Sequence, residues 1–279
     1  MKTVFITGTS SGFGQETAIK FALKGWNVIA TMRNPEDDKI LREYENILVL
    51  KLDVTDEMMI KESVNMAINK YSNIDVLINN AGYGVAGFLE EASNEEIMTQ
   101  FNTNVIGAIN LIKEIVPYMR KNKSGKIINV SSLGGNIAMP MFSLYSSTKF
   151  AIEGLSQSLA YELKEFEIDV KTIAPGAFKT GFSKATKILS GNKKEELNTY
   201  RKAYEEHLNK IMTTPPKPFK FGNPSYVADE IFRCATSHSN ITNLVGQDAK
   251  LLMFLKKVLP SFMFRNMLKK TTMPIYKNS

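Results

Sequence analysis

The sequence contains few of the residues that form cross-links and metal sites. One cysteine, Cys234, occurs in 279 residues, which excludes an intrachain disulfide and a site built from several thiolates. The two histidines, His207 and His238, are far apart and do not form an H-E-x-x-H pattern. We therefore expect no metal site, and we expect Cys234 to be a small core residue.

Two further absences concern location and partners. No apolar run reaches the roughly 18 residues of a membrane-spanning helix, and the N-terminus MKTVFITG lacks the pattern of a signal peptide. Both absences predict a cytoplasmic protein. The net charge of +7 is uneven, because residues 247–279 hold seven basic residues and one acidic residue, which is +6 and leaves 7 − 6 = +1 for the rest. A near-neutral body predicts no nucleic-acid partner.

Apolar, strand-like runs alternate with helix-like segments along most of the chain. Runs such as Val76-Leu77-Ile78 lack polar alternation, which indicates strands buried on both faces. The pattern predicts an α/β fold: a doubly wound, Rossmann-type parallel sheet of about seven strands with helices on both faces, in one domain over 1–279. The expected strands are 3–7, 26–31, 47–52, 74–78, 126–130 and 168–174, and the expected helices are 14–24, 36–45, 57–71, 95–119, 143–166 and 226–234.

The chain changes character after its sixth expected strand. Residues 181–213 are polar with helical spacing, and a loop with four prolines follows at 213–224. We expect 181–223 to form a substrate lid and 247–279 to form a basic, apolar C-terminal tail. Earlier in the chain, Pro117 is expected to end the long helix that begins at residue 95.

A glycine-rich turn follows the first expected strand and opens the first helix. Residues 7–14 read Thr-Gly-Thr-Ser-Ser-Gly-Phe-Gly. Glycines permit a sharp turn, and the backbone N–H groups of a helix N-terminus favour a pyrophosphate. The spacing G-x-x-x-G-x-G departs from G-x-G-x-x-G, so the turn alone leaves open a glycine turn without a ligand.

The same turn fits a second pattern. G-x-S-x-G, the nucleophile turn of α/β-hydrolases, would make Ser10 a nucleophile, with Asp169 and His207 or Asp229 and His238 completing a triad. Such a turn normally follows several strands, whereas this one follows the first. Hydrolase chemistry is therefore the weaker alternative.

The end of the second strand indicates which dinucleotide would bind. An acidic residue there would bind the ribose 2′-OH of NAD, but Thr31 stands near that position and Arg33 follows. A guanidinium offers several fixed donors to a 2′-phosphate. The sequence therefore favours NADP(H), with NAD(H) as the alternative and a solvated surface arginine as the plain structural interpretation of Arg33.

A group of polar residues further along has the composition of an acid/base site. Tyr145 and Lys149 are four residues apart on an expected helix, so both project from one face. Ser132 follows the fifth expected strand, at the carboxyl edge where open α/β sheets bind ligands. Asn104 lies in the helix before that strand.

Together these motifs resemble the short-chain dehydrogenase/reductase family, in particular its hydroxysteroid and retinol dehydrogenase branch. The resemblance covers roughly residues 1–180, and Ser132 lies 145 − 132 = 13 residues before the tyrosine, as that family expects. The matching residues, in chain order, are 7–14, Asp53-Val54, the Asn-Asn-Ala-Gly at 79–82, the N-x-x-G at 104–107, Ser132, Tyr145, Lys149, Pro175-Gly176 and Thr180.

The resemblance implies a role for each catalytic candidate. Tyr145 would be the proton donor in reduction and the acceptor in oxidation, and the Lys149 ammonium should lower the tyrosine pKa from its ordinary value of about 10. Ser132 would hold the substrate oxygen, and Asn104 would keep a water that links Lys149 to solvent. The family is usually dimeric or tetrameric through the helices of Asn104 and Tyr145, so a homodimer or homotetramer is expected.

The resemblance also assigns the residues around NADP(H). The glycine turn would hold the pyrophosphate, residues 53–54 and 80–82 the adenosine half, and the segment after the sixth strand the nicotinamide, whose ribose Lys149 would bind. The expected cofactor residues are Gly8, Ser10, Gly12, Phe13, Gly14, Arg33, Asp53, Val54, Asn80, Ala81, Gly82, Tyr145, Lys149, Pro175, Gly176, Phe178 and Thr180.

The residues expected near the substrate are mostly apolar. Met139 and Phe182 should join Ser132 and Tyr145 there, and Tyr83, Leu133, Met141 and Phe142 are further candidates. Such a set suits a small hydrophobic carbonyl or alcohol, although ordinary core packing would explain it equally well.

Two alternatives stay open at this point. A non-catalytic NADP(H)-binding sensor could keep the same fold, although intact catalytic candidates argue against it. The tail could lie on an anionic membrane surface as a peripheral contact, or it could pack over the substrate cleft or against another subunit.

Overall fold

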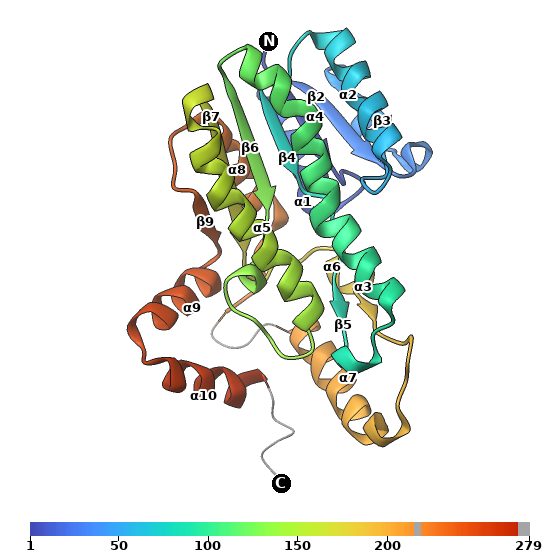
Figure 1. The fold of residues 1–279 in the computed structure, drawn as a ribbon, viewed down its shortest axis with the longest axis vertical. Helices are drawn as coiled ribbons and strands as arrows, with labels where there is room; N and C mark the ends of the chain where they lie inside the picture. The colour runs from blue at the N-terminus through green and yellow to red at the C-terminus, as the bar shows by residue number, and fades with distance from the viewer. Residues whose placement is uncertain (215–218, 273–279) are drawn as a thin grey trace.

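A seven-stranded parallel sheet forms the centre of the computed structural model, which describes residues 1–214 and 219–272 (Figure 1). The strand order is β3-β2-β1-β4-β6-β7-β9, so the chain moves outward in both directions from β1 and β4. This order confirms the expected doubly wound, Rossmann-type α/β fold, in which ligands bind beyond the carboxyl ends of the strands. The strands are β1 (Thr3–Thr7), β2 (Asn27–Met32), β3 (Ile47–Lys51), β4 (Val76–Asn79), β6 (Gly125–Val130), β7 (Ile168–Pro175) and β9 (Thr242–Val245).

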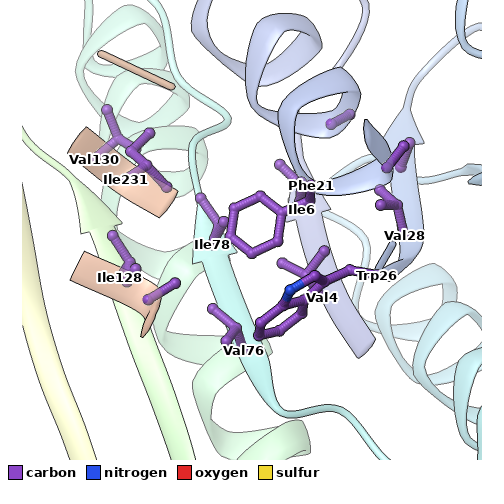
Figure 2. Packing of buried hydrophobic residues seen from close by; sticks show 14 of the residues in the cluster. Val4, Ile6, Phe21, Trp26, Val28, Val76, Ile78, Ile128, Val130 and Ile231 are labelled. Atoms are coloured by element: carbon purple, nitrogen blue, oxygen red, sulfur yellow. The ribbon is translucent and has the colours of Figure 1, made fainter. Parts of the chain in front are cut away.

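Helices cover both faces of the sheet because alternate strand residues point to opposite sides. Val4 and Ile6 of β1 pack against helices α1 (Gly12–Leu23) and α8 (Pro224–Thr236), and Figure 2 shows Phe21 of α1 on this side. Phe5, between them, packs on the other side, in a cluster that helices α2, α4 and α5 complete. These helices are α2 (Glu57–Tyr71), α4 (Gly107–Lys121) and α5 (Ser143–Glu162).

The prediction of a charged helix at 36–45 is wrong. Two 3-10 turns, η1 (Pro35–Asp37) and η2 (Leu41–Glu43), occupy the segment. The Asp38 carboxylate accepts hydrogen bonds from the N–H groups of Ile40, Leu41 and Arg42 at 3.1–3.3 Å. A short acidic side chain that bonds nearby N–H groups competes with helical hydrogen bonds, so this segment forms short turns and not an α-helix.

The long helix expected at 95–119 has a different form. It comprises α3 (Asn94–Phe101), a π-helical turn η4 (Asn102–Ile106) and α4, which continues past Pro117. The proline faces solvent, while Ile115 and Met119 beside it are fully buried. Packing of these two side chains holds the last turn in helical form despite the missing N–H. The helix expected at 143–166 similarly ends at residue 162, and a 3-10 turn η6 (Lys164–Phe166) follows.

The remaining elements lie beyond the carboxyl ends of the strands (Figure 1). The short parallel pair β5 (Val85–Ala86) and β8 (Lys187–Ile188) joins the expected lid to the loop after β4. Residues 215–218 of that lid and 273–279 of the tail lie outside the described residues. The other elements are 3-10 turns η3 (Leu89–Glu91), η5 (Leu133–Gly135) and η7 (Glu195–Leu197), and helices α6 (Phe182–Ala185), α7 (Asn198–Thr213), α9 (Gln247–Val258) and α10 (Ser261–Thr272). None of the described helices is long and apolar enough to cross a membrane.

Candidate active site

The glycine turn after β1 has a backbone that only glycine fits. Gly8 and Gly12 adopt positive φ angles of +69° and +60°, which side chains strongly disfavour. A Cβ on Gly8 would lie 2.9 Å from the Ala81 Cα, and a Cβ on Gly14 would collide with the Gly8 carbonyl oxygen. The turn therefore packs tightly against the loop after β4 and leads into the N-terminus of α1, a geometry that suits a pyrophosphate.

The Asn-Asn-Ala-Gly motif after β4 supports this turn directly. The Asn80 side chain donates to the carbonyl oxygens of Thr7 and Gly8, both at 2.9 Å. In return, Thr7 Oγ1 accepts from the N–H groups of Asn80 and Ala81, both at 3.0 Å. Two sequence motifs that are more than 70 residues apart therefore form one hydrogen-bonded unit at the switch point of the sheet.

The expected adenosine-binding residues lie around the same edge. Arg33 follows β2 with an exposed side chain, and Ser10 is exposed on the glycine turn. Asp53 Oδ1 accepts from the Thr55 N–H at 2.9 Å, and Val54 is buried where a Cβ on Gly107 would come within 2.7 Å of its carbonyl oxygen. The glycine turn, the exposed Arg33 guanidinium and the ordered loop at 53–54 together fit the adenosine diphosphate part of NADP(H).

The expected nicotinamide segment after β7 closes on the glycine turn. The Phe178 and Phe13 rings meet edge to face with centroids 5.7 Å apart, and Thr180 Cβ would lie 3.7 Å from a Cβ on Gly12. Pro175 is buried at the end of β7. The structure thus brings together the beginning and the end of the expected cofactor site.

Sequence reasoning missed one residue that holds this segment. Asp248 in the first turn of α9 accepts a hydrogen bond from the Ala177 N–H at 2.6 Å. A Cβ on Gly176 would collide with the same carboxylate. The C-terminal tail therefore contributes to the cofactor side of the molecule.

Ser132 and Tyr145 meet at the carboxyl end of β6. Ser132 is the N-cap of η5, and its Oγ accepts from the Gly134 N–H at 3.0 Å. A Cβ on Gly134 would lie 3.4 Å from both Ser132 Oγ and Tyr145 Cε1. Burial raises the pKa of Tyr145 to about 12, although its hydrogen bond with Ser132 acts in the opposite direction. In the protein alone, burial thus outweighs the hydrogen bond with Ser132, and the pKa of Tyr145 does not fall as we expected.

Lys149 lies one helical turn from the tyrosine and is buried as well. Its Nζ donates to the Val130 carbonyl oxygen at 2.9 Å and lies 5.8 Å from the centre of the Tyr145 ring. Burial lowers the pKa of Lys149 to about 8, while the carboxylate of Glu153 raises it. Lys149 therefore carries its proton at neutral pH and loses it as the pH rises through about 8.

Asn104 stands in the π-helical turn η4, a distortion that often marks functional positions. Its Oδ1 accepts from the Tyr83 N–H at 3.1 Å, and its Nδ2 donates to the Tyr83 carbonyl oxygen at 3.0 Å and to Thr148 Oγ1 at 3.2 Å. A Cβ on Gly82 would lie 3.1 Å from Asn104 Oδ1 and 3.7 Å from Lys149 Nζ. Asn104 thus fixes the loop that borders the lysine.

Apolar side chains surround the tyrosine on the expected substrate side. The Phe182 ring centre lies 5.4 Å from that of Tyr145. Leu208 of α7 and Ala86 of β5 were not predicted, because no pattern in the polar segment 181–213 shows which face turns inward. The cluster around Tyr145 consists of Ala86, Met139, Phe142 and Leu208.

The structure argues against a hydrolase triad at Ser10. Ser10 follows the carboxyl end of β1, whereas Asp169 lies at the start of β7, at the opposite edge of the sheet, and pairs with Lys126 at 3.5 Å. Asp229 pairs with Lys20. Each acidic candidate therefore has a cationic partner of its own.

Comparison with known proteins identifies the family. The family model described as short chain dehydrogenase matches residues 2–188. The chain belongs to this family. The uncharacterized oxidoreductase YusZ of Bacillus subtilis is 37% identical over 96% of this chain and 98% of its own. A 3-ketodihydrosphingosine reductase of Bacteroides thetaiotaomicron is 43% identical over 64% of this chain and 65% of its own.

Two solved structures have the same fold as this chain. A short-chain dehydrogenase from Streptomyces avermitilis is 31% identical with a TM-score of 0.80, over 97% of this chain and 96% of its own. ElxO with NADP bound is 32% identical with a TM-score of 0.71, over 88% of this chain and 95% of its own. These likenesses confirm the oxidoreductase family that the motifs predicted, while its hydroxysteroid and retinol branch stays a prediction.

Proposed function

We propose that this short-chain dehydrogenase is an NADP(H)-dependent oxidoreductase that interconverts a hydrophobic ketone or aldehyde and its alcohol. The observation that carries the proposal is the buried Tyr145 hydroxyl, which is hydrogen-bonded to Ser132, beside the Lys149 ammonium and an apolar wall. A buried proton donor beside a cation and a hydroxyl has the components of general acid–base catalysis at a carbonyl oxygen.

Each residue of the candidate site has its own role in the proposed reaction. A nicotinamide held beside residues 175–180 would supply or take up the hydride. Tyr145, with a pKa of about 12, carries its proton at neutral pH and donates it to the substrate oxygen during reduction. In oxidation Tyr145 accepts the proton, and the positive charge of Lys149 stabilises the phenolate. Ser132 holds the substrate oxygen by a hydrogen bond, and Asn104 keeps the loop beside Lys149 in place.

NADP(H) is the preferred cofactor in this proposal, with NAD(H) as a weaker substitute. The exposed Arg33 at the end of β2 is available to a 2′-phosphate. ElxO, a structural neighbour, binds NADP, which supports the same preference. The glycine turn and Asn80 would hold the pyrophosphate side, and residues 175–180 the nicotinamide side.

The substrate that we propose is apolar. The side chains that surround the tyrosine on this side include Phe182, Leu208 and Met139, all of them apolar. Apolar walls of this kind favour hydrophobic ligands. The segment 181–223 would act as the lid, because buried Arg201 of α7 pairs with buried Glu91 of η3 and so attaches α7 over this side. We further propose that the enzyme works in the cytoplasm.

The test is NADPH consumption with a panel of apolar ketones and aldehydes, for the wild-type protein and Tyr145→Phe. We expect turnover to fall at least about 100-fold. The thermal shift with saturating NADPH should persist in the variant, and should exceed the shift with NADH in the wild type. Tyr161→Phe is the matched control, since Tyr161 is on the same helix and 75% exposed. Unchanged turnover in Tyr145→Phe would refute the assigned role of the tyrosine. A thermal shift with NADPH in the wild type, without turnover of any compound in the panel, would favour a non-catalytic NADP(H)-binding sensor.

A further inference from the structure

The two C-terminal helices carry apolar side chains on their outer face. Leu251, Phe254 and Val258 have the i, i+3, i+7 spacing of one helical stripe on α9, and they are 43%, 60% and 53% exposed. On α10, Phe262 is 62% exposed and Met263 is 46% exposed. An apolar stripe normally faces the core, so a second stripe that faces outward indicates a binding surface.

The inner face of the same helices is already occupied. Ala249 and Phe264 are buried against Leu133 and Ile137, which follow Ser132 in the chain. The tail is therefore anchored on the body of the protein, and the outward stripe is not the face that it needs for its own packing.

Basic side chains accompany the outer apolar ones. Lys250, Lys257 and Arg265 are exposed on these helices, and Lys269 and Lys270 follow in the last turn of α10. Asp248 is the one acidic residue of α9 and α10, and its carboxylate is used by the Ala177 N–H. The outer face thus combines positive charge with exposed aromatic and aliphatic groups.

We propose that this outer surface of α9 and α10 docks on an anionic lipid bilayer. Lipid phosphates would neutralise the basic residues, while Phe254 and Phe262 enter the boundary between headgroups and acyl chains. A second copy of the chain fits this surface poorly, because a two-fold contact would bring the two sets of cations together. Docking does not depend on the proposed reaction.

The test uses a double variant that changes only exposed groups, Phe254→Gln with Lys257→Glu. Truncation after Gly246 is unsuitable, because it would also remove Asp248 and the packing on Leu133. The matched control is Met58→Gln with Lys61→Glu on α2. This pair has the same i, i+3 spacing, and Met58 is 69% exposed.

Co-sedimentation with vesicles gives the readout. We expect the wild type and the control to pellet with phosphatidylglycerol/phosphatidylcholine vesicles in low salt and to be released by high salt. Neither protein should pellet with vesicles of pure phosphatidylcholine. The tail variant should bind at least about tenfold more weakly. Its NADPH thermal shift should equal that of the wild type, which separates this test from that of the proposed function.

Three results would overturn the docking proposal. The first is that the wild type does not bind anionic vesicles. The second is that the tail variant and the control lose vesicle binding equally. The third is that the tail variant forms a smaller oligomer than the wild type, while neither protein binds vesicles. The third result would assign the surface to self-association.

Discussion

At the scale of single residues, Glu153 adds a buried carboxylate to the candidate site, and none of the sequence motifs includes this residue. It lies one helical turn after Lys149 and is buried, and its carboxylate accepts hydrogen bonds from Asn136, Thr172 and Thr242 at 2.9–3.2 Å. Three donors fix the position of the carboxylate. Its negative charge therefore favours the ammonium form of Lys149.

This arrangement predicts a pH effect of Glu153→Gln. Lys149 carries its proton below a pH of about 8, and we expect kcat/KM for reduction to fall as the pH rises through that value, because the ammonium is lost. Removal of the carboxylate takes away a stabiliser of the charged form, so the lysine pKa falls and the alkaline limb of the profile moves to lower pH. The pKa of Tyr145, about 12, is too high to produce that limb.

The measurement is the pH profile of kcat/KM for the wild type, Glu153→Gln and Thr242→Val. The threonine variant removes one hydrogen bond to the carboxylate but keeps the charge, so its limb should stay near that of the wild type. An unmoved limb in Glu153→Gln, or an equal movement in both variants, would show that packing rather than charge is responsible.

The sequence predicted which residues meet at the candidate site better than it predicted their surroundings. The structure brings Ser132, Tyr145 and Lys149 together, as the strand ends, the i, i+4 rule and the family resemblance led us to expect. Glu153 and Asp248 were not found, because a lone acid in a helical segment has the same pattern whether it is solvated or buried. Only tertiary packing decides between the two.

At the scale of elements, the first turn of α9 connects the tail with the expected nicotinamide segment. We predict that Asp248→Ala weakens NADPH binding about tenfold, because the partly buried Ala177 N–H loses its acceptor and an unsatisfied donor costs about 1–3 kcal/mol. Asp248→Asn keeps an acceptor oxygen and should bind NADPH nearly as the wild type does. Calorimetric titration with NADPH measures both, and equal affinities for Asp248→Ala and the wild type would contradict the prediction.

Element positions were predictable where periodicity is strong. The central strands and α2 occur close to their expected bounds, because continuous apolar runs leave few alternatives. The four-residue strand β9 was missed, since Thr242–Val245 is too short to show a period. The segment 36–45 and Pro117 were misread for opposite reasons: a side-chain hydrogen bond overrides helical spacing in one case, and core packing overrides a helix breaker in the other.

At the scale of the whole molecule, the helices of Asn104 and Tyr145 carry exposed apolar groups on their outer sides. Ile106 at the end of η4 is 42% exposed and Phe150 on α5 is 43% exposed, and a buried cluster with Val105 and Ile152 lies at the same place. We propose that two copies pair through this face, as in the homodimer or homotetramer that the family resemblance implies. Pairing would bury both groups and would stabilise the helices that hold Lys149.

Phe150→Glu should therefore dissociate the oligomer, because the substitution buries an unpaired charge in each copy at a two-fold contact. We expect sedimentation velocity to show a smaller species than the wild type, with a dimer affinity at least about 100-fold weaker. Leu23→Glu introduces the same charge at a site on α1 that is 69% exposed, on the opposite face of the sheet, and it should leave the assembly intact. A monomeric wild type, or an unchanged Phe150→Glu, would exclude pairing through α5. If the variant dissociates and NADPH turnover falls with it, assembly supports the geometry of the site; if turnover persists, each subunit holds a complete site of its own.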